Sequence, residues 1–427
     1  MTQLLGVRIA NLRKQKKLST KKLATGIISI SYLSNIETCK KIPSLETLLF
    51  LADRLNVSHQ QLVFEEVVNS DLETLFIDLF NCLVRNQMLE AKQKLDEIEH
   101  NYSIQMESPI AEISYYLLVC IYQLKSWQFN EAQEIRELFI HSFAKLIDKS
   151  FLPIELQRYY YFYEGLRLNL ATSYLESINS YQKYLALEHS DAKMNVMVEG
   201  YIALNYICLS QYESALKLID SALDKTKKLP LNQQGNKIQL LYFKGFVYYF
   251  IQFYDHAVTS LEAALISLED YPEMEAEFRL IIHYRLVCTL QEMKAESEKE
   301  TYLDAFYFSL IAKLQSNRPI LKNEYLPIAE LFVLFSEKGE LEKAELLLAT
   351  LNGLEARPQE MDYFIQFGSA LCAIHAGNEK AYVEQITQLL KVIHLSNDDS
   401  FIQKVKKQAS SYFAKQQKYK KSYEILK

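Results

Sequence analysis

The chain has 427 residues, a formal net charge of −6 and 49% hydrophobic residues. This length exceeds what one compact core accommodates, and the composition excludes a disordered chain. With only 10 Gly and 8 Pro, the long stretches rich in Leu, Ala, Glu, Lys and Tyr favour helices joined by short turns. The sequence therefore predicts an all-α protein, built as two domains or as a solenoid.

Charge is distributed unevenly along the chain. Residues 1–64 hold ten Lys or Arg against three acids, a balance of +7, which leaves −13 for the remaining residues. A small basic head on a large acidic body indicates that only the head meets a polyanion. Chance variation in surface charge is the alternative interpretation.

Several function classes lack their sequence signals. The six cysteines stand singly, without CxxC or a Cys/His cluster, so we predict neither a zinc site nor a disulfide framework. The sequence has no P-loop, dinucleotide-binding glycine turn or nucleophile elbow. We therefore predict no catalytic residue, no metal and no cofactor. No apolar run of about 18 residues occurs, so we expect no membrane partner, and a reducing cytoplasm fits best.

Apolar periodicity predicts short helices in the head, which we place at residues 1–66. Ser19 suits the N-cap of the second helix, and Gly26 can end it. Pro43 and Ser44 precede the fourth helix. The helices are expected over about residues 4–17, 20–25, 29–37 and 45–55. A tight turn between the second and third is the helix-turn-helix layout.

The stretch from Ile9 to Ser58, IANLRKQKKLSTKKLATGIISISYLSNIETCKKIPSLETLLFLADRLNVS, resembles the Xre/Cro-type helix-turn-helix. In that family the third helix enters the major groove. The resemblance implies that Asn35 pairs with adenine and Ile30 packs on a thymine methyl, while flanking lysines neutralise phosphates. The implied DNA-binding residues are Lys21, Lys22, Ser29, Ile30, Ser31, Tyr32, Asn35, Lys40 and Lys41.

Some head residues have a structural alternative. Tyr32 packs either on DNA or on the second helix. Lys14 fits a solvated face better than a DNA contact. Arg13 and Glu37 resemble the family's internal salt bridge, so we interpret both as structural. Cys39 stands where the pattern usually has Gly. Either a left-handed backbone there costs roughly 1 kcal/mol, or the loop has shifted.

The body, residues 67–427, carries a tetratricopeptide pattern: a small residue, an aromatic three positions later and an Ala twelve positions after the small one. The clearest units are Gly245/Tyr248/Ala257/Leu261/Ala264 and Ala203/Tyr206/Ala215/Ile219/Ala222. Helical hairpins are predicted near residues 70–99, 110–146, 155–187, 195–228, 236–268, 275–316, 322–353, 360–394 and 400–427. Such hairpins stack into a right-handed superhelix whose concave face is lined by the first helix of each pair.

A concave groove of this kind commonly binds an extended or helical peptide. Tyr159 and Phe162 are candidate lining residues, although aromatic residues at helical spacing also build cores. An Asn side chain can clamp a peptide backbone because it both donates and accepts hydrogen bonds, but it can equally be a satisfied structural amide. The predicted peptide-binding residues are Asn169, Asn205, Tyr242, Phe246 and Tyr249.

A Cro-type head fused to a tetratricopeptide body resembles the RRNPP family of peptide-pheromone receptors, with features of its PlcR-type and NprR-type members. The resemblance implies a quorum-sensing transcription regulator that binds a double-stranded DNA operator and a short signalling peptide. It also implies a homodimer or higher homo-oligomer. The alternative is a body that mainly docks a signalling protein such as a response regulator, with phosphatase-like or sequestering activity.

Overall fold

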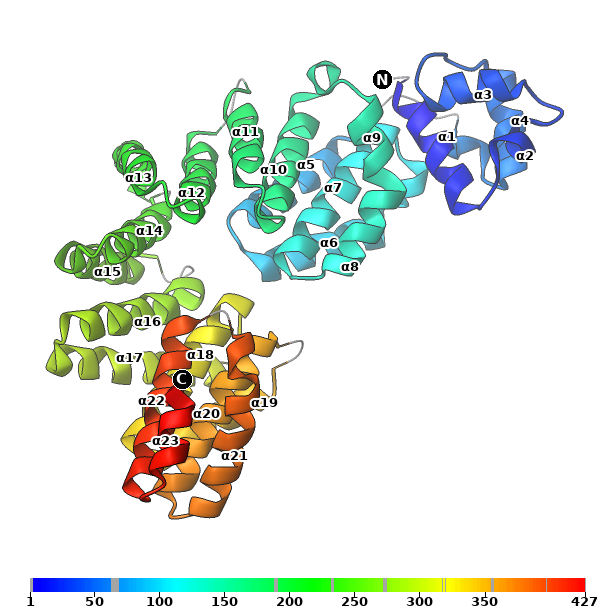
Figure 1. Cartoon of the computed structure of the whole chain (residues 1–427). Coiled ribbons are helices and arrows are strands. Elements are labelled where there is room, and N and C mark those ends of the chain that lie inside the picture. Colours follow the sequence, from blue (N-terminus) through cyan, green and yellow to red (C-terminus); the bar gives the residue numbers. More distant parts are fainter. Residues whose placement is uncertain are drawn as a thin grey trace. The chain divides into compact units, whose positions relative to one another are not determined.

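The computed structural model describes residues 3–62, 69–187, 191–231, 234–271, 275–316, 318, 320–354, 357–396 and 398–426. Throughout these residues the regular elements are helices, and none of them forms a strand. The chain divides into two compact units, residues 1–247 and 248–427. Each is described by itself (Figure 1). The predicted boundary between residues 66 and 67 lies outside the described residues.

The head forms the predicted helices, and serine caps start three of them. The Oγ atoms of Ser19, Ser29 and Ser44 accept backbone N–H bonds of 3.1, 3.0 and 3.3 Å, which satisfy amides that have no partner inside the helix. The helices are α1 (Gln3–Gln15), α2 (Thr20–Ala24), α3 (Ile30–Glu37), α4 (Leu45–Leu55) and a short 3-10 turn, η1 (His59–Gln61). The helix-turn-helix layout is therefore confirmed.

The first unit continues with helical hairpins. They are α5 (Ser70–Val84) with α6 (Met88–Asn101), α7 (Pro109–Lys125) with α8 (Phe129–Ile135), α10 (Ile154–Leu170) with α11 (Tyr174–Leu185), and α12 (Ala192–Cys208) with α13 (Tyr212–Thr226). After α8 the chain passes through a π-helical turn, η3 (Arg136–Ile140), into α9 (His141–Leu146). Helix α14 (Asn236–Phe250) contains the division between the units.

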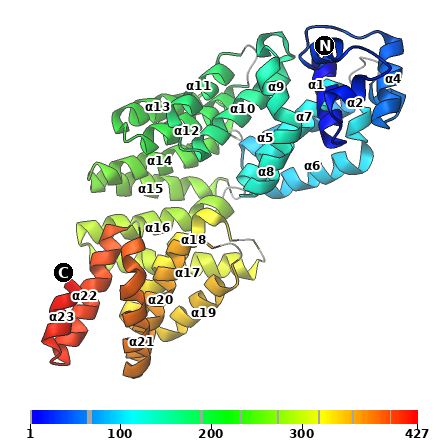
Figure 2. The same cartoon turned by 45° about the vertical axis from the view of Figure 1, so that its right-hand side comes forward.

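The second unit repeats the same arrangement. Its helices are α15 (Tyr254–Glu269), α16 (Glu275–Met293), α17 (Glu296–Gln315), α18 (Lys322–Lys338), α19 (Leu341–Asn352), α20 (Gln359–His375), α21 (Glu379–Val392), α22 (Asp399–Lys415) and α23 (Tyr419–Leu426). Each predicted hairpin range coincides with a helix pair, except that 110–146 holds α7 followed by α8, η3 and α9. Figure 2 shows the pairs from a second angle.

Small residues allow the paired helices to approach closely, as the repeat pattern predicts. Ala215 and Ala257 are fully buried. A Cβ added at Gly165 would lie 2.5 Å from the Tyr181 ring, so α10 and α11 meet at a position that accepts no side chain. Tyr159 and Phe162 do not line a groove. Both are core residues, 2% and 0% exposed.

Helix α1 belongs to two cores at once. Leu5 and Ile9 pack in the core of the head, whereas Leu4 and Val7 pack in the core of the first repeats. Both views place α1 beside α7 and α9 (Figures 1 and 2). The first helix of the head therefore also serves as its attachment to the body.

The buried Arg8 fixes this attachment. Its Nε donates to Glu112 Oε2 of α7 at 2.7 Å. Its Nη1 and Nη2 donate to the carbonyl oxygens of Gln61 and Glu107 at 3.0 and 2.6 Å. From the same helix, Asn11 Nδ2 donates to the carbonyl oxygen of Phe139 at 3.2 Å. We call these contacts the head–body joint.

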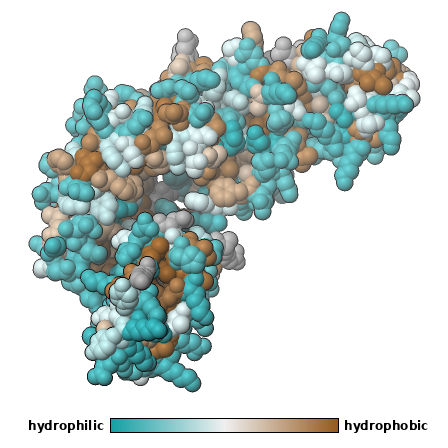
Figure 3. Space-filling model, viewed as in Figure 1, coloured by the Kyte–Doolittle hydropathy of each residue, from teal (hydrophilic) through white to brown (hydrophobic). Residues whose placement is uncertain are grey.

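Figure 3 shows hydrophilic side chains over much of the visible face, with apolar patches between them. No described helix combines the length and apolar character that crossing a membrane requires. In the described ranges, His, Cys, Asp and Glu side chains do not gather in groups of three that could hold a metal ion.

Candidate nucleic-acid interface and peptide site

One face of α3 is anchored in the head and the other is accessible. Leu33 and Ile36 are fully buried, which holds the helix in place. Ser29, Ser31 and Ile30 are exposed, Ile30 to 50%. The half-buried Tyr32 packs against the head core, which includes Leu23 and Ala24 of α2. Asn35 is half-buried on the same helix. An exposed, rigidly held helix face is what major-groove reading requires.

Exposed lysines flank this face on two sides. Lys21 and Lys22 lie on α2, and Lys40 and Lys41 follow α3. The backbone amides of Lys40 and Lys41 donate to the carbonyl oxygen of Asn35 at 2.8 and 3.2 Å. The Arg54 guanidinium donates to the carbonyl oxygens of Lys22 and Thr25, both at 2.9 Å. The backbone at these lysines is thus fixed, while their ammonium groups reach solvent.

The Arg13–Glu37 salt bridge holds α1 against the end of α3. Nε and Nη2 of Arg13 donate to the two carboxylate oxygens of Glu37 at 2.6 and 2.8 Å. This bidentate hydrogen bonding raises the pKa of Arg13. The predicted structural role of both residues is confirmed. Lys14 donates to Ser142 Oγ of α9 at 3.1 Å, so it contacts the body.

Cys39 has a left-handed backbone, with φ of 62°. The thiol is half-buried and packs against the repeat core. Its side chain therefore occupies space between the end of α3 and the body, where the family pattern would place a glycine.

The two asparagines predicted to bind peptide contact each other. Asn169 Nδ2 donates to Asn205 Oδ1 at 3.0 Å, and Asn205 Nδ2 donates to the carbonyl oxygen of Tyr201 at 2.7 Å. Asn205 is 1% exposed, so it has the position of a satisfied structural amide. Asn169 is half-buried and is the more accessible of the two.

Three further residues, which were not among the predicted site residues, extend this pair. Lys125 donates to Asn86 Oδ1 and, at 2.6 Å, to Tyr201 Oη. Its ammonium lies 5.0 Å from the Tyr201 ring centre. We call Asn86, Lys125, Asn169, Tyr201 and Asn205 the inner polar cluster. Asn86, Lys125, Asn169 and Asn205 lie at or near the carboxyl ends of the first helices of successive hairpins. Comparing helix ends, rather than helix interiors, would have found them.

The predicted aromatic residues lie elsewhere. Tyr242 and Phe246 are half-buried on α14, with ring centroids 6.1 Å apart, and pack against another apolar cluster. Tyr249 belongs to the second unit, where the Arg285 guanidinium lies 5.0 Å from its ring centre. Burial raises the pKa of Tyr249 to about 12. The structure thus brings together the asparagines, while Tyr242 and Phe246 form a separate group.

Comparison with known proteins supports the two-part organisation. Residues 9–62 match the family described as Helix-turn-helix. No curated protein sequence matches the chain. The apo form of RapI is similar with a TM-score of 0.56 and 13% identity, covering 83% of this chain and 96% of RapI. A Rap protein complexed with competence and sporulation factor has a TM-score of 0.53 and 13% identity, covering 84% of this chain and 96% of the Rap protein. NprR in complex with its cognate peptide NprX has a TM-score of 0.49 and 14% identity, covering 84% of this chain and 97% of NprR.

The likeness to the Rap structures is one of fold and spans most of the body. It agrees with the repeat pattern read from the small and aromatic positions. The chain is therefore a helix-turn-helix protein with a tetratricopeptide-like repeat body, and its structural neighbours are members of the RRNPP family.

Proposed function

We propose that the protein is a cytoplasmic transcription regulator whose DNA binding is switched by a short signalling peptide held in the repeat body. The observation that carries the proposal is the position of the head. Its α3 face is accessible, while α1 is hydrogen-bonded to the first repeats through Arg8 and Asn11. A ligand that acts on those repeats therefore has a direct route to the DNA-reading helix.

On DNA, α3 would read bases and the lysines would bind the backbone. Asn35 would pair bidentately with adenine, which would account for about 1–3 kcal/mol of discrimination. Ile30 would pack on a thymine methyl. The phosphates would be contacted by Lys21, Lys22, Lys40 and Lys41, so this contribution would fall with salt. One head has a small surface, and specific binding would therefore need two heads, supplied by a homodimer or higher oligomer, on two half-sites.

In the body, the inner polar cluster has the chemistry to hold a peptide backbone. Asn169 offers an amide that a peptide carbonyl could occupy in place of Asn205 Oδ1. The Lys125 ammonium could bind a peptide carbonyl or carboxylate in place of Asn86. Peptide binding would thus exchange hydrogen bonds between neighbouring hairpins for hydrogen bonds to the ligand.

Helix α7 connects the two sites. Lys125 ends this helix, and Glu112 in its first turn holds Arg8 of the head. A shift of α7 on peptide binding would move Glu112 and change the preferred position of the head. A coupling of about 2.7 kcal/mol would change DNA affinity about 100-fold.

The test is a DNA-binding titration with the fragment upstream of the protein's own gene. Synthetic peptides encoded by short reading frames beside the gene are added to the wild type and to three variants. Asn35→Ala is expected to lose specific binding but keep salt-sensitive nonspecific binding. Asn169→Ala is expected to bind DNA normally and lose the peptide response, whereas Asn101→Ala, an exposed asparagine on α6, keeps both.

Normal operator binding by Asn35→Ala would contradict the choice of α3 as reading helix. If no peptide changes DNA binding of the wild type, while the body retains a response regulator in a pull-down, the alternative of protein docking is favoured instead.

A further inference from the structure

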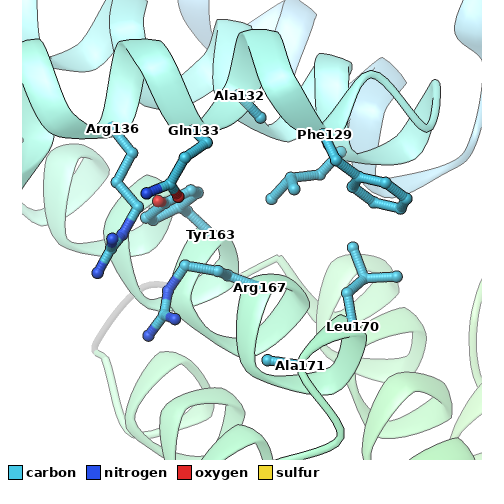
Figure 4. A pocket seen from close by; sticks show the side chains of 9 residues that line it. Phe129, Ala132, Gln133, Arg136, Tyr163, Arg167, Leu170 and Ala171 are labelled. Atoms are coloured by element: carbon cyan, nitrogen blue, oxygen red, sulfur yellow. The ribbon is translucent and has the colours of Figure 1, made fainter.

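A hollow lies between α8 and α10, outside the inner polar cluster. It has a volume of about 250 Å³ and shares no residue with that cluster. Figure 4 shows it from close by. It is lined by Leu124, Phe129, Ala132, Gln133, Arg136, Tyr163, Arg167, Leu170 and Ala171. The volume is below the range of about 300–1,000 Å³ typical of sites for drug-sized ligands, so it suits a single residue or a molecule of that size.

The hollow is divided into an apolar and a cationic half. Phe129 and Leu170 face each other on one side, and the guanidinium groups of Arg136 and Arg167 lie together on the other (Figure 4). No acidic residue is among the described lining residues. A ligand that matches both halves carries an apolar group next to an anion.

Of the two arginines that line the hollow, Arg136 is the one available to bind that anion. Arg167 already holds Glu164, with Nη2 and Nε donating at 2.7 and 3.3 Å. The exposed Glu137 accepts a bond of 2.6 Å from the Gln133 amide. In the part of the chain that the structure describes, Arg136 has no carboxylate within ion-pair distance. A planar carboxylate is the anion that a guanidinium binds best, through two parallel hydrogen bonds.

The wall of the hollow continues into the head–body joint. Arg136 is the first residue of the π-helical turn η3, and π turns within α-helices often mark functional sites. Three residues further, the carbonyl oxygen of Phe139 accepts the bond from Asn11, and Ser142 accepts the bond from Lys14. A ligand bound to Arg136 would therefore reduce the mobility of η3, to which α1 is hydrogen-bonded through Asn11.

We propose that this hollow binds an apolar carboxylate, with Arg136 as its anion-binding residue, and that occupancy stabilises the docked position of the head. Two sources share this chemistry: the free carboxyl-terminal residue of a peptide, and a small apolar acid. The site stands independently of the proposed peptide response, because it uses none of the inner polar cluster.

The protein carries its own reporter for the test. Trp127 is its single tryptophan, and its ring centroid lies 5.6 Å from that of Phe129 in the apolar half. The full-length protein is titrated with N-acetyl-phenylalanine, its amide, the tripeptide Ala-Ala-Phe and the amidated tripeptide, while Trp127 fluorescence is recorded. The carboxylates are expected to give a saturable change, and the amides at least about tenfold weaker binding.

Two variants distinguish anion binding by Arg136 from a nonspecific effect of the protein's net charge. Arg136→Gln is expected to weaken carboxylate binding at least about tenfold. Lys217→Gln, which removes one exposed positive charge on α13, is expected to leave it unchanged. Tighter binding of the tripeptide would identify a peptide end as the source, and equal binding would identify a small acid. Equal responses to acids and amides, or wild-type binding by Arg136→Gln, would overturn the site.

Hydrogen exchange tests the coupling to the head. With saturating N-acetyl-phenylalanine, the amides of α1 and α9 are expected to exchange several-fold more slowly. Amides of α20, in the second unit, serve as the internal reference. Unchanged exchange in α1 and α9 despite saturation would overturn the coupling.

Discussion

Each unit contains a buried ion pair between a carboxylate and a cationic side chain, and the two pairs have different structural roles. Arg8–Glu112 and Lys313–Glu324 are both 2.7 Å long, and all four side chains are at most 9% exposed. The first joins residues 104 positions apart, from the head to α7. The second joins residues 11 positions apart, across the turn from α17 to α18. One pair holds a domain in place, and the other closes a local turn.

The pairs also differ in what remains when one partner is removed. Arg8 has two further acceptors, the carbonyl oxygens of Gln61 and Glu107. Glu324 receives Lys313 on both carboxylate oxygens and the Leu321 amide at 2.7 Å. Burial raises the pKa of both Glu112 and Glu324 against the opposing effect of their cationic partners. The joint is therefore expected to tolerate a substitution that the turn does not.

The largest effect is expected for Lys313→Met. Glu324 would remain buried without its cation, which costs about 3–5 kcal/mol. Urea unfolding followed by circular dichroism should show the second unit unfolding earlier, while Trp127 fluorescence reports an unchanged first unit. The double variant Lys313→Met/Glu324→Leu should recover most of the loss. An equal shift of the Trp127 transition would contradict the separation of the units.

Next in size is the pH effect expected from His283, which lies in the second unit. Burial, with a smaller effect of Arg279, lowers the pKa of His283 to about 4 from 6.5. Between these two pH values, His283 is therefore protonated in the unfolded chain but neutral in the folded unit. The contribution of His283 to the free energy of unfolding is fully present above pH 6.5. It falls as the pH drops toward about 4, by about 3 kcal/mol in total.

Circular dichroism in urea at several pH values measures this dependence. His283→Gln should flatten the curve between neutral pH and about pH 4. A curve that keeps its full slope in His283→Gln would assign the pH dependence to other groups. A drop of the same size in the Trp127 transition would place part of it in the first unit.

Glu112→Gln is expected to cost less, about 2 kcal/mol, because the amide keeps a hydrogen bond and Arg8 keeps two carbonyl acceptors. Hydrogen exchange in α1 should accelerate while the core of the second unit stays protected. If α7 transmits the peptide signal, DNA binding by this variant should become less sensitive to peptide. Glu176→Gln, an exposed residue on α11, is the matched control and should behave as wild type.

The smallest effect concerns the backbone beside the joint. Cys39 adopts φ of 62°, a region that glycine enters without the steric cost of a Cβ. Cys39→Gly should therefore raise stability by up to about 1 kcal/mol, offset by the lost contact of the thiol with the repeat core. Thermal unfolding of Cys39→Ala, which keeps the Cβ, should show no gain. Equal gains in both variants would mean that backbone strain is not the cause.

The local features of the head and the repeats were predictable because neighbouring residues dictate them. Ser19, Ser29 and Ser44 cap helices with their own side chains. Period and turn residues located the hairpins, and small residues at fixed spacing located the helix contacts. The Arg13–Glu37 bridge came from resemblance to a family pattern. Each of these depends on a short stretch of chain or on a recurring motif.

The candidate peptide site was only partly predictable. Asn169 and Asn205 stood out as amides inside apolar helices, and the structure joins them. Lys125 can be recognised as a polar residue at a helix end, but nothing local identifies Tyr201, 76 residues later, as its partner. Tyr159 and Phe162 illustrate the reverse error, since burial depends on neighbours that periodicity does not identify.

By itself, the sequence determined which stretches form helices and helical hairpins, and that a basic head precedes an acidic body. These follow from capping, hydrophobic period and charge, which act over a few residues. Tertiary structure alone decided that α1 is shared by two cores and that Arg8 and Asn11 meet α7 and η3, 104 and 128 residues away. Such pairings depend on packing many helices together, and that packing holds the head against the first repeats.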